Sequence, residues 1–196
     1  MIVAMQDRLP DPIDERVVMR LDWDGFEALL ELRGERARPK VAYLDGVLEL
    51  MSPSFNHERI KSNIGRVVEA YMMHANVTFT TCGEWTIRRR KQRAGVEPDE
   101  CYAFGPAGPV DRPDLAIEVV WTSGGIDKLE IYRRLGIPEV WFWIDGAITV
   151  YVLGDTGYET RPGSVCVPTV DLGVVCELLD IEVTSDIYKQ LRARLG

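Results

Sequence analysis

Cysteine is scarce in this sequence and never closely spaced. The four cysteines, Cys82, Cys101, Cys166 and Cys176, form no CxxC pair, and structural zinc sites are usually built from such pairs. In a reducing cytosol these thiols would stay reduced, and we expect each to be a small buried residue. The spacing therefore argues against a thiolate zinc centre.

Long apolar segments are also missing. No run approaches the ~18 apolar residues of a membrane span. The first residues, MIVAMQDRLPDPIDER, lack the basic start, apolar stretch and cleavage site of a signal peptide. We therefore expect a soluble cytoplasmic protein with no membrane partner. Hydrophobic residues still make up 46% of the 196 residues, which is enough for one sizeable core.

Basic residues are fewer than acidic residues in this sequence. The formal net charge is -8, which counts against broad, non-specific nucleic-acid binding. The exception is one short basic run, which contains Arg88, Arg89, Arg90, Lys91 and Arg93. Such a run can grip a phosphate backbone, or it can be a solvated hairpin tip, and the sequence supports both interpretations equally.

The hydrophobic pattern predicts a single domain over residues 1–196, with an extended N-terminal arm over 1–20 and a core over about 40–153. Turn signals at Asp45-Gly46 and Asp145-Gly146 predict two β-hairpins. The expected helices cover a short segment after Asp22, then 57–74, 126–135 and 185–195. The expected strands cover 77–90, 97–104, 115–121 and 140–144, with further short strands over 158–183. The fold class is α/β (α+β): a mixed β-sheet flanked by helices, with extra hairpins.

One carboxylate lies inside an apolar strand. Glu118 is flanked by apolar residues in LAIEVVW (115–121), a pattern typical of a strand buried on both faces. Burying an unpaired carboxylate costs several kcal/mol, so Glu118 needs a cation, a metal or a shifted pKa. Pairing with an arginine is the structural alternative.

Asp99 begins another strand about twenty residues earlier, and a sheet can place two strand carboxylates side by side. Mg²⁺ and Mn²⁺ prefer such oxygen ligands, and the Val119 carbonyl is a candidate third ligand.

Further charged residues surround these carboxylates in the sequence. Lys128 follows Glu118 by ten residues, near a helix start, where it could orient a water or offset negative charge. A solvated lysine paired with a neighbouring acid is the alternative. His57 and Glu58 open the long helix and could complete a metal shell or touch a substrate. A glutamate in a first helical turn is also favoured by the helix dipole alone.

Three segments together resemble the Uma2 family within the PD-(D/E)XK nuclease superfamily. They are LDGVLELMSPSFNH (44–57), GVEPDECY (95–102) and RPDLAIEVVWTSGGIDKLEIYRRLGIPEVWFWIDG (112–146). The resemblance covers roughly residues 44–151. It implies a restriction-endonuclease-like fold, a Mg²⁺ or Mn²⁺ site at one end of the sheet, and endonuclease activity on DNA.

Residue by residue, the resemblance assigns Asp99 as the first carboxylate and Glu118 as the second, and His57 as the histidine after the Ser-Pro turn. The superfamily lysine would fall two residues after Glu118, where this chain has Val120. The resemblance implies that Lys128 takes its place.

Asp114 is a rival for the first carboxylate, because it also follows a proline. However, it lies four residues before Glu118 on the same strand. Their side chains could share a face but would be roughly 13 Å apart at ~3.3 Å per residue. Asp99 is therefore preferred.

Two other functions remain open on the sequence. The fold could persist as an inactive module that binds nucleic acid or protein, because function depends on the site and not on the fold. A homodimer is also suggested by the adjacent aromatics Trp141, Phe142 and Trp143, which place rings on both faces of one strand. Covering helices would explain those rings equally.

Overall fold

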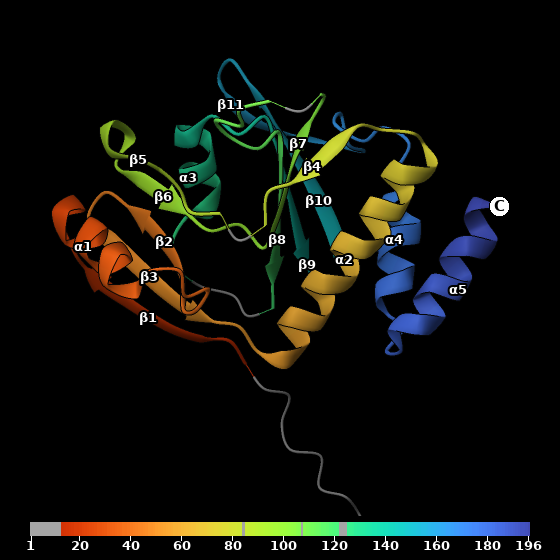
Figure 1. The fold of residues 1–196 in the computed structure, drawn as a ribbon, viewed down its shortest axis with the longest axis horizontal. Helices are drawn as coiled ribbons and strands as arrows, with labels where there is room; N and C mark the ends of the chain where they lie inside the picture. The colour runs from red at the N-terminus through yellow and green to blue at the C-terminus, as the bar shows by residue number, and fades with distance from the viewer. Residues whose placement is uncertain (1–12, 84, 107, 122–124) are drawn as a thin grey trace, which may run out of the picture.

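The computed structural model describes residues 13–83, 85–106, 108–121 and 125–196, which form two β-sheets and five α-helices (Figure 1). The first sheet has the strand order β1-β3-β2-β6-β5, and every neighbouring pair in it is antiparallel. Its strands are β1 (Glu15–Arg20), β2 (Lys40–Leu44), β3 (Val47–Ser52), β5 (Ile87–Arg89) and β6 (Ala94–Val96). The β2–β3 hairpin confirms the turn signal, since Asp45 and Gly46 have the positive φ values, 48° and 88°, that a type I′ turn requires.

The second sheet carries the centre of the molecule. Its strand order is β11-β10-β9-β8-β7-β4, and only β8 and β9 are parallel. Its strands are β4 (Phe79–Thr81), β7 (Glu100–Phe104), β8 (Leu115–Val120), β9 (Glu139–Ile144), β10 (Ala147–Gly154) and β11 (Gly157–Arg161). The apolar run around Glu118 is therefore a central strand, as predicted, and β8 has neighbours on both sides.

The buried apolar residues form three clusters, and the helices contribute to each of them. The helices are α1 (Trp23–Arg33), α2 (Phe55–His74), α3 (Lys128–Leu135), α4 (Leu172–Leu179) and α5 (Thr184–Leu195). Helices α2, α4 and α5 pack with one face of the second sheet, and α1 packs against the first sheet (Figure 1). Helix α3 contributes to the cluster that joins the two sheets. The sheets thus meet at α3, and the residues of the candidate site lie along this junction.

The structure confirms the mixed α+β class and corrects several element boundaries. The strand predicted over 77–90 is two strands, β4 and β5, which belong to different sheets. Gly83 lies in the break between them, and its φ of +61° interrupts extended backbone. The strand predicted over 97–104 begins only at Glu100. Only short strands were predicted over 158–183, but part of this segment is the helix α4. Asp171 caps the first turn of α4 by accepting from the Val174 N–H.

The predicted N-terminal arm is described only in part. Residues 1–12 lie outside the described residues. Glu15–Arg20 forms β1 at the edge of the first sheet, in antiparallel register with β3. Within the described part of the chain, no helix combines the length and apolar character that a bilayer crossing requires.

Candidate active site

The candidate site lies where the chain passes from the first sheet to the second. Asp99 stands between β6 and β7. Strand β7 pairs with β8 up to Glu100 and Ile117, so Asp99 and Glu118 occupy the next position along the two strands. Beyond that last pair, the Asp99 carboxylate itself accepts a hydrogen bond from the Val119 N–H at 2.8 Å. The two acids that were predicted from separate strands are therefore brought together.

Asp99 is buried and fully engaged by cationic and neutral donors. One oxygen, Oδ1, accepts from the Lys40 ammonium, which also donates to the Pro98 carbonyl at 3.0 Å. The other oxygen, Oδ2, lies 3.2 Å from Nε2 of His57. Burial opposes ionisation of Asp99, but the charges of Lys40 and His57 outweigh it and hold the pKa of Asp99 well below its usual range.

His57 connects Asp99 to a second buried acid. Its Nδ1 lies 3.0 Å from Oδ2 of Asp14, and the other Asp14 oxygen accepts from the Ser54 N–H at 2.9 Å. Burial alone would lower the pKa of His57, but its hydrogen bonds and charge interactions with the two aspartates raise the pKa to about 9. His57 is therefore a cation at neutral pH, clamped between two carboxylates.

Glu118 is completely buried and depends on helix α3 for its partners. Oε2 accepts from the Lys128 ammonium at 2.6 Å, and Oε1 accepts from the Tyr132 hydroxyl. Burial raises the pKa of Glu118, the charge of Asp99 raises it further, and Lys128 acts in the opposite direction. Lys128 and Tyr132 are four residues apart on one helix, so both face the same strand.

A cavity of about 290 Å³ is bordered by residues that contact this pair of carboxylates. Val119 and Lys128 contribute to its lining, as does Glu49 of β3. The Glu49 carboxylate is buried and accepts from the Ile126 N–H at 3.1 Å. The cavity is the route by which a solvent-borne group could reach the Lys128 ammonium, whose side chain is 18% exposed.

Four residues of this arrangement were not predicted: Asp14, Lys40, Glu49 and Tyr132. Glu49 carries the same signal as Glu118, because it is a carboxylate within an apolar strand, VLELM. Tyr132 could have been found from its spacing of four residues from Lys128. Nothing in the sequence around Asp14 or Lys40 distinguishes them from surface residues.

Asp99 and Glu118 have the oxygen ligands that a divalent cation prefers, and the cation would replace donors such as Lys40 and Lys128, from which these oxygens now accept hydrogen bonds. Asp99 and Glu118 supply carboxylate oxygens from neighbouring strands, and Val119 lines the adjacent cavity. Hard cations such as Mg²⁺ commonly take only one or two carboxylates from the protein. Within the described ranges, no cluster of three His, Cys, Asp or Glu residues has the arrangement of a metal site, so the protein ligands would be few.

Two residues considered as accessory members have other partners. Glu58 pairs with Arg38 at 3.2 Å and with Lys61 at 3.8 Å. Asp114 lies at the opposite end of β8 from Glu118, where its carboxylate accepts from the Phe104 N–H at 2.8 Å. Each therefore contributes to local structure.

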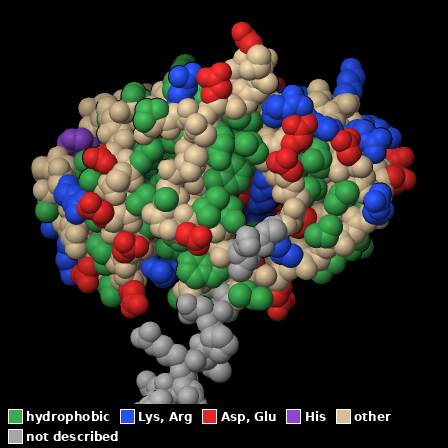
Figure 2. Space-filling view, turned by 180° about the vertical axis from the view of Figure 1, so that it is seen from behind, with side chains coloured by type: hydrophobic (Ala, Val, Ile, Leu, Met, Phe, Trp, Pro, Cys, Tyr) green, Lys and Arg blue, Asp and Glu red, His purple; other side chains and the backbone are tan. Residues whose placement is uncertain are grey.

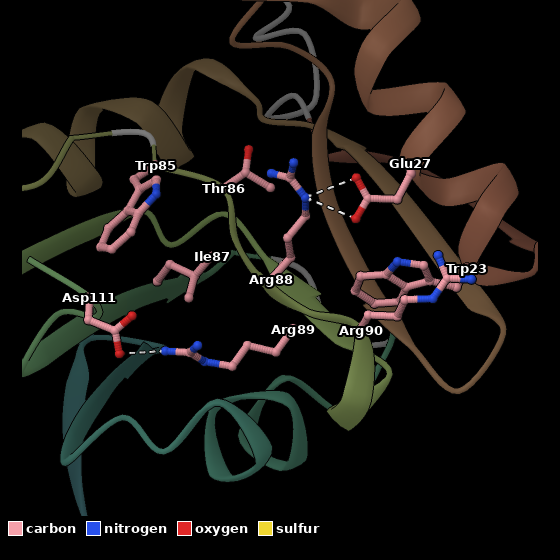
Figure 3. A pocket seen from close by; sticks show the side chains of 9 residues that line it. All are labelled: Trp23, Glu27, Trp85, Thr86, Ile87, Arg88, Arg89, Arg90 and Asp111. Carbon is pink, nitrogen blue, oxygen red and sulfur yellow. Dashed lines mark hydrogen bonds and ion pairs between the residues drawn. The ribbon is translucent and has the colours of Figure 1, made fainter.

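The basic run forms a turn that is already paired with acids. Arg88 donates to Glu27 at 3.1 Å, and Arg89 donates to Asp111 at 2.6 Å (Figure 3). Arg90 and Arg93 likewise pair with exposed carboxylates, those of Asp24 and Asp45.

Arg88, Arg89 and Arg90 line a different cavity, of about 450 Å³, together with Trp23 and Trp85 (Figure 3). The turn contacts the C-terminal end of α3, where Arg134 donates to the Gln92 carbonyl. Lys128 is the first residue of that helix, so the turn and Lys128 lie at opposite ends of α3. On the face shown in Figure 2, acidic and basic side chains are interspersed.

Comparison with known proteins identifies the family and the fold. The family model Uma2, described as "putative restriction endonuclease", matches residues 23–179. A crystal structure of a "putative nuclease belonging to DUF820" from Anabaena variabilis superposes with a TM-score of 0.53 at 16% sequence identity, over 86% of this chain and 97% of that chain. No curated protein matches the sequence. The structural likeness establishes a shared fold, and because the family match spans most of the chain, the protein belongs to the Uma2 family.

Proposed function

We propose that the protein is a metal-dependent endonuclease that hydrolyses phosphodiester bonds in DNA. The observation that carries the proposal is the buried pair Asp99 and Glu118, together with Lys128, which contacts Glu118 and lines a cavity. Asp99, Glu118 and the Val119 carbonyl would hold Mg²⁺ or Mn²⁺. A bound ion of this kind would lower the pKa of a water and offset charge on the phosphate.

The remaining residues of the site supply positive charge or fix the orientation of the two carboxylates. Lys128 is placed to donate a hydrogen bond to the attacking water or to a phosphate oxygen, where it would offset negative charge that develops in the transition state. Lys40 and His57 keep Asp99 ionised and fix its orientation. Tyr132 fixes the orientation of Glu118 by donating to one of its oxygens.

The reaction is an ordinary hydrolysis. A water oxygen bonds to phosphorus as the bond from phosphorus to one sugar oxygen breaks, and a proton of the water ends on that leaving oxygen. The basic turn, Arg88–Arg93, would contact the DNA backbone away from the scissile phosphate. Assembly as a homodimer stays a prediction, which sedimentation would test.

A plasmid-nicking assay tests the proposal. Supercoiled DNA is incubated with the wild type, Asp99→Asn and Glu118→Gln, with Mg²⁺, with Mn²⁺ and with a chelator. We expect metal-dependent nicking that falls by about 100-fold or more in both variants, as for loss of a charge-stabilising group. Glu130→Gln is the matched control, because Glu130 lies on α3 but pairs with Arg133 and Arg134.

The other outcomes separate the alternatives. Equal nicking by wild type and both variants would show that the site does not cut. A folded wild type that binds Mn²⁺ in calorimetry but leaves plasmid intact would point to a different nucleic-acid substrate. Inactivity without metal binding would favour an inactive binding module.

A further inference from the structure

The cavity beside Lys128 has two chemically different walls. The polar wall carries the charged side chains of Arg16, Glu49, Asp127 and Lys128. A second wall, on one face of the sheet, is apolar and aromatic, and it contains Val120, Phe142, Ile144 and Tyr151. A site that needed only to admit a phosphate and water would require no apolar wall, so this wall indicates a second recognition task.

The apolar wall continues directly from the candidate catalytic glutamate. In the parallel β8–β9 pair, Glu118 is in register with Phe142, and Val120 is in register with Ile144. Side chains two residues apart on a strand share one face, so these four side chains lie on the same side of the sheet. Neighbouring strands are ~4.8 Å apart, so the Phe142 and Glu118 side chains extend side by side from this face.

The wall is shaped by aromatic packing and remains open to solvent. The Phe142 and Tyr151 rings meet edge to face, with centroids 5.7 Å apart and an interplanar angle of 90°. Ile144 is 44% exposed at the end of β9. By contrast, Trp141 and Trp143 point to the other face of the same strand, where helices cover them. Phe142 is therefore the ring of this aromatic segment that borders a cavity.

We propose that this cavity receives one unstacked nucleobase, so that the preferred substrate is single-stranded or locally unpaired DNA. The inference rests on the proposed function, which places the adjacent phosphate at Lys128. A nucleobase offers an apolar π-face that stacks on aromatic side chains irrespective of its identity. In a duplex the base is already stacked and paired, and it would have to be extruded to reach Phe142.

The test is a binding measurement without cleavage. Fluorescence anisotropy with a chelator present compares a labelled single strand of about 15 nucleotides with a hairpin duplex of the same sequence. We expect the wild type to bind the single strand about 10-fold more tightly than the duplex. Phe142→Ala should weaken single-strand binding by about 5- to 100-fold, as for loss of one stacking surface, and should leave duplex binding unchanged.

Two further variants guard against an effect of misfolding. Phe142→Trp retains an aromatic surface and should retain single-strand binding. Ile144→Glu changes an exposed side chain at the rim, so the fold should tolerate it, and its carboxylate should weaken single-strand binding by repelling the DNA. Tyr188→Ala is the control, since Tyr188 is 48% exposed on α5. Thermal melting confirms that each variant is folded.

The outcomes separate this inference from the proposed function. Single-strand preference that depends on Phe142, without any cleavage when metal is added, would support the base site and contradict the nuclease. Metal-dependent nicking by a protein that binds duplex and single strand equally would do the reverse. Absence of binding to either DNA, or binding that ignores Phe142 and Ile144, overturns the inference.

Discussion

The Lys128 ammonium lies 2.6 Å from Oε2 of Glu118, although the two residues belong to different elements. Glu118 is fully buried in the central strand β8, whereas Lys128 begins helix α3 and borders the cavity. The pair thus links a carboxylate that is shielded from solvent to an ammonium that is still partly exposed to it. Its consequences for stability can be measured separately from any activity.

Lys128→Met should destabilise the protein because it leaves the Glu118 charge without its cation. Removing one partner of a buried pair typically costs about 3–5 kcal/mol, and we expect about 3 kcal/mol at pH 7. The pKa of Glu118 is already raised by burial, and loss of Lys128 would raise it further. The folded state would then favour the protonated acid, so the loss should grow as the pH rises above the unfolded value of about 4.3.

Urea denaturation of Lys128→Met, Glu118→Gln and the double variant measures this coupling. The double variant should be more stable than the two single losses added together. Strict additivity at pH 7 would show that the ion pair contributes nothing to stability.

His57 should make the stability depend on pH in the alkaline range. Its pKa is raised to about 9 from an ordinary value of 6.5, so its contribution is complete below pH 6.5 and is lost as the pH rises through 9. The shift corresponds to about 3 kcal/mol. His57→Gln should flatten the decline in unfolding free energy between pH 6 and 9.5. The control is His74→Gln, because His74 is exposed and is the only other histidine.

Prediction from sequence worked best where one strand or helix carried the whole signal. The apolar run around Glu118 predicts a central strand because burial on both faces needs apolar residues at every position. The ten-residue step to Lys128 likewise covers one strand end and one helix start. The structure places both side chains in contact, but their roles in catalysis stay predictions.

Prediction failed where two sheets meet. The alternating pattern of residues 77–90 is the same whether its strands join one sheet or two, because alternation reports only which side of a strand is buried. Lys40 and Asp14 reach Asp99 and His57 through contacts that span 59 and 43 residues in sequence. Such partners depend on tertiary packing, and no local pattern contains them.

The ionised carboxylate of Glu100 should destabilise the folded protein at neutral and alkaline pH. Burial raises its pKa from 4.5 to about 7, with Glu69 adding to the rise and Lys61 opposing it. The folded protein therefore favours the protonated acid, and stability is lost as the pH rises from 4.5 through 7. Glu100→Gln should be more stable than the wild type by about 3 kcal/mol at pH 8, and the two should converge near pH 4. A difference that is constant with pH would contradict this.

The basic turn gives a prediction about salt dependence. Arg89 is 39% exposed and pairs with Asp111, which is 79% exposed. Exposed ion pairs of this kind contribute only about 0–1 kcal/mol, so a DNA phosphate can compete for the arginine. If the turn contacts the backbone, Arg89→Gln should weaken DNA binding and reduce the slope of log affinity against log salt by about 1.

Arg161→Gln is the matched control for this substitution. Arg161 is 52% exposed on β11 and pairs with the exposed Glu159 at 2.9 Å, so it has the same charge and a similar environment on a different strand. Anisotropy titrations at several salt concentrations give both slopes. Equal slopes for the wild type and the two variants would mean that Arg89 only stabilises the loop around Asp111, and the DNA backbone would then have to contact another surface.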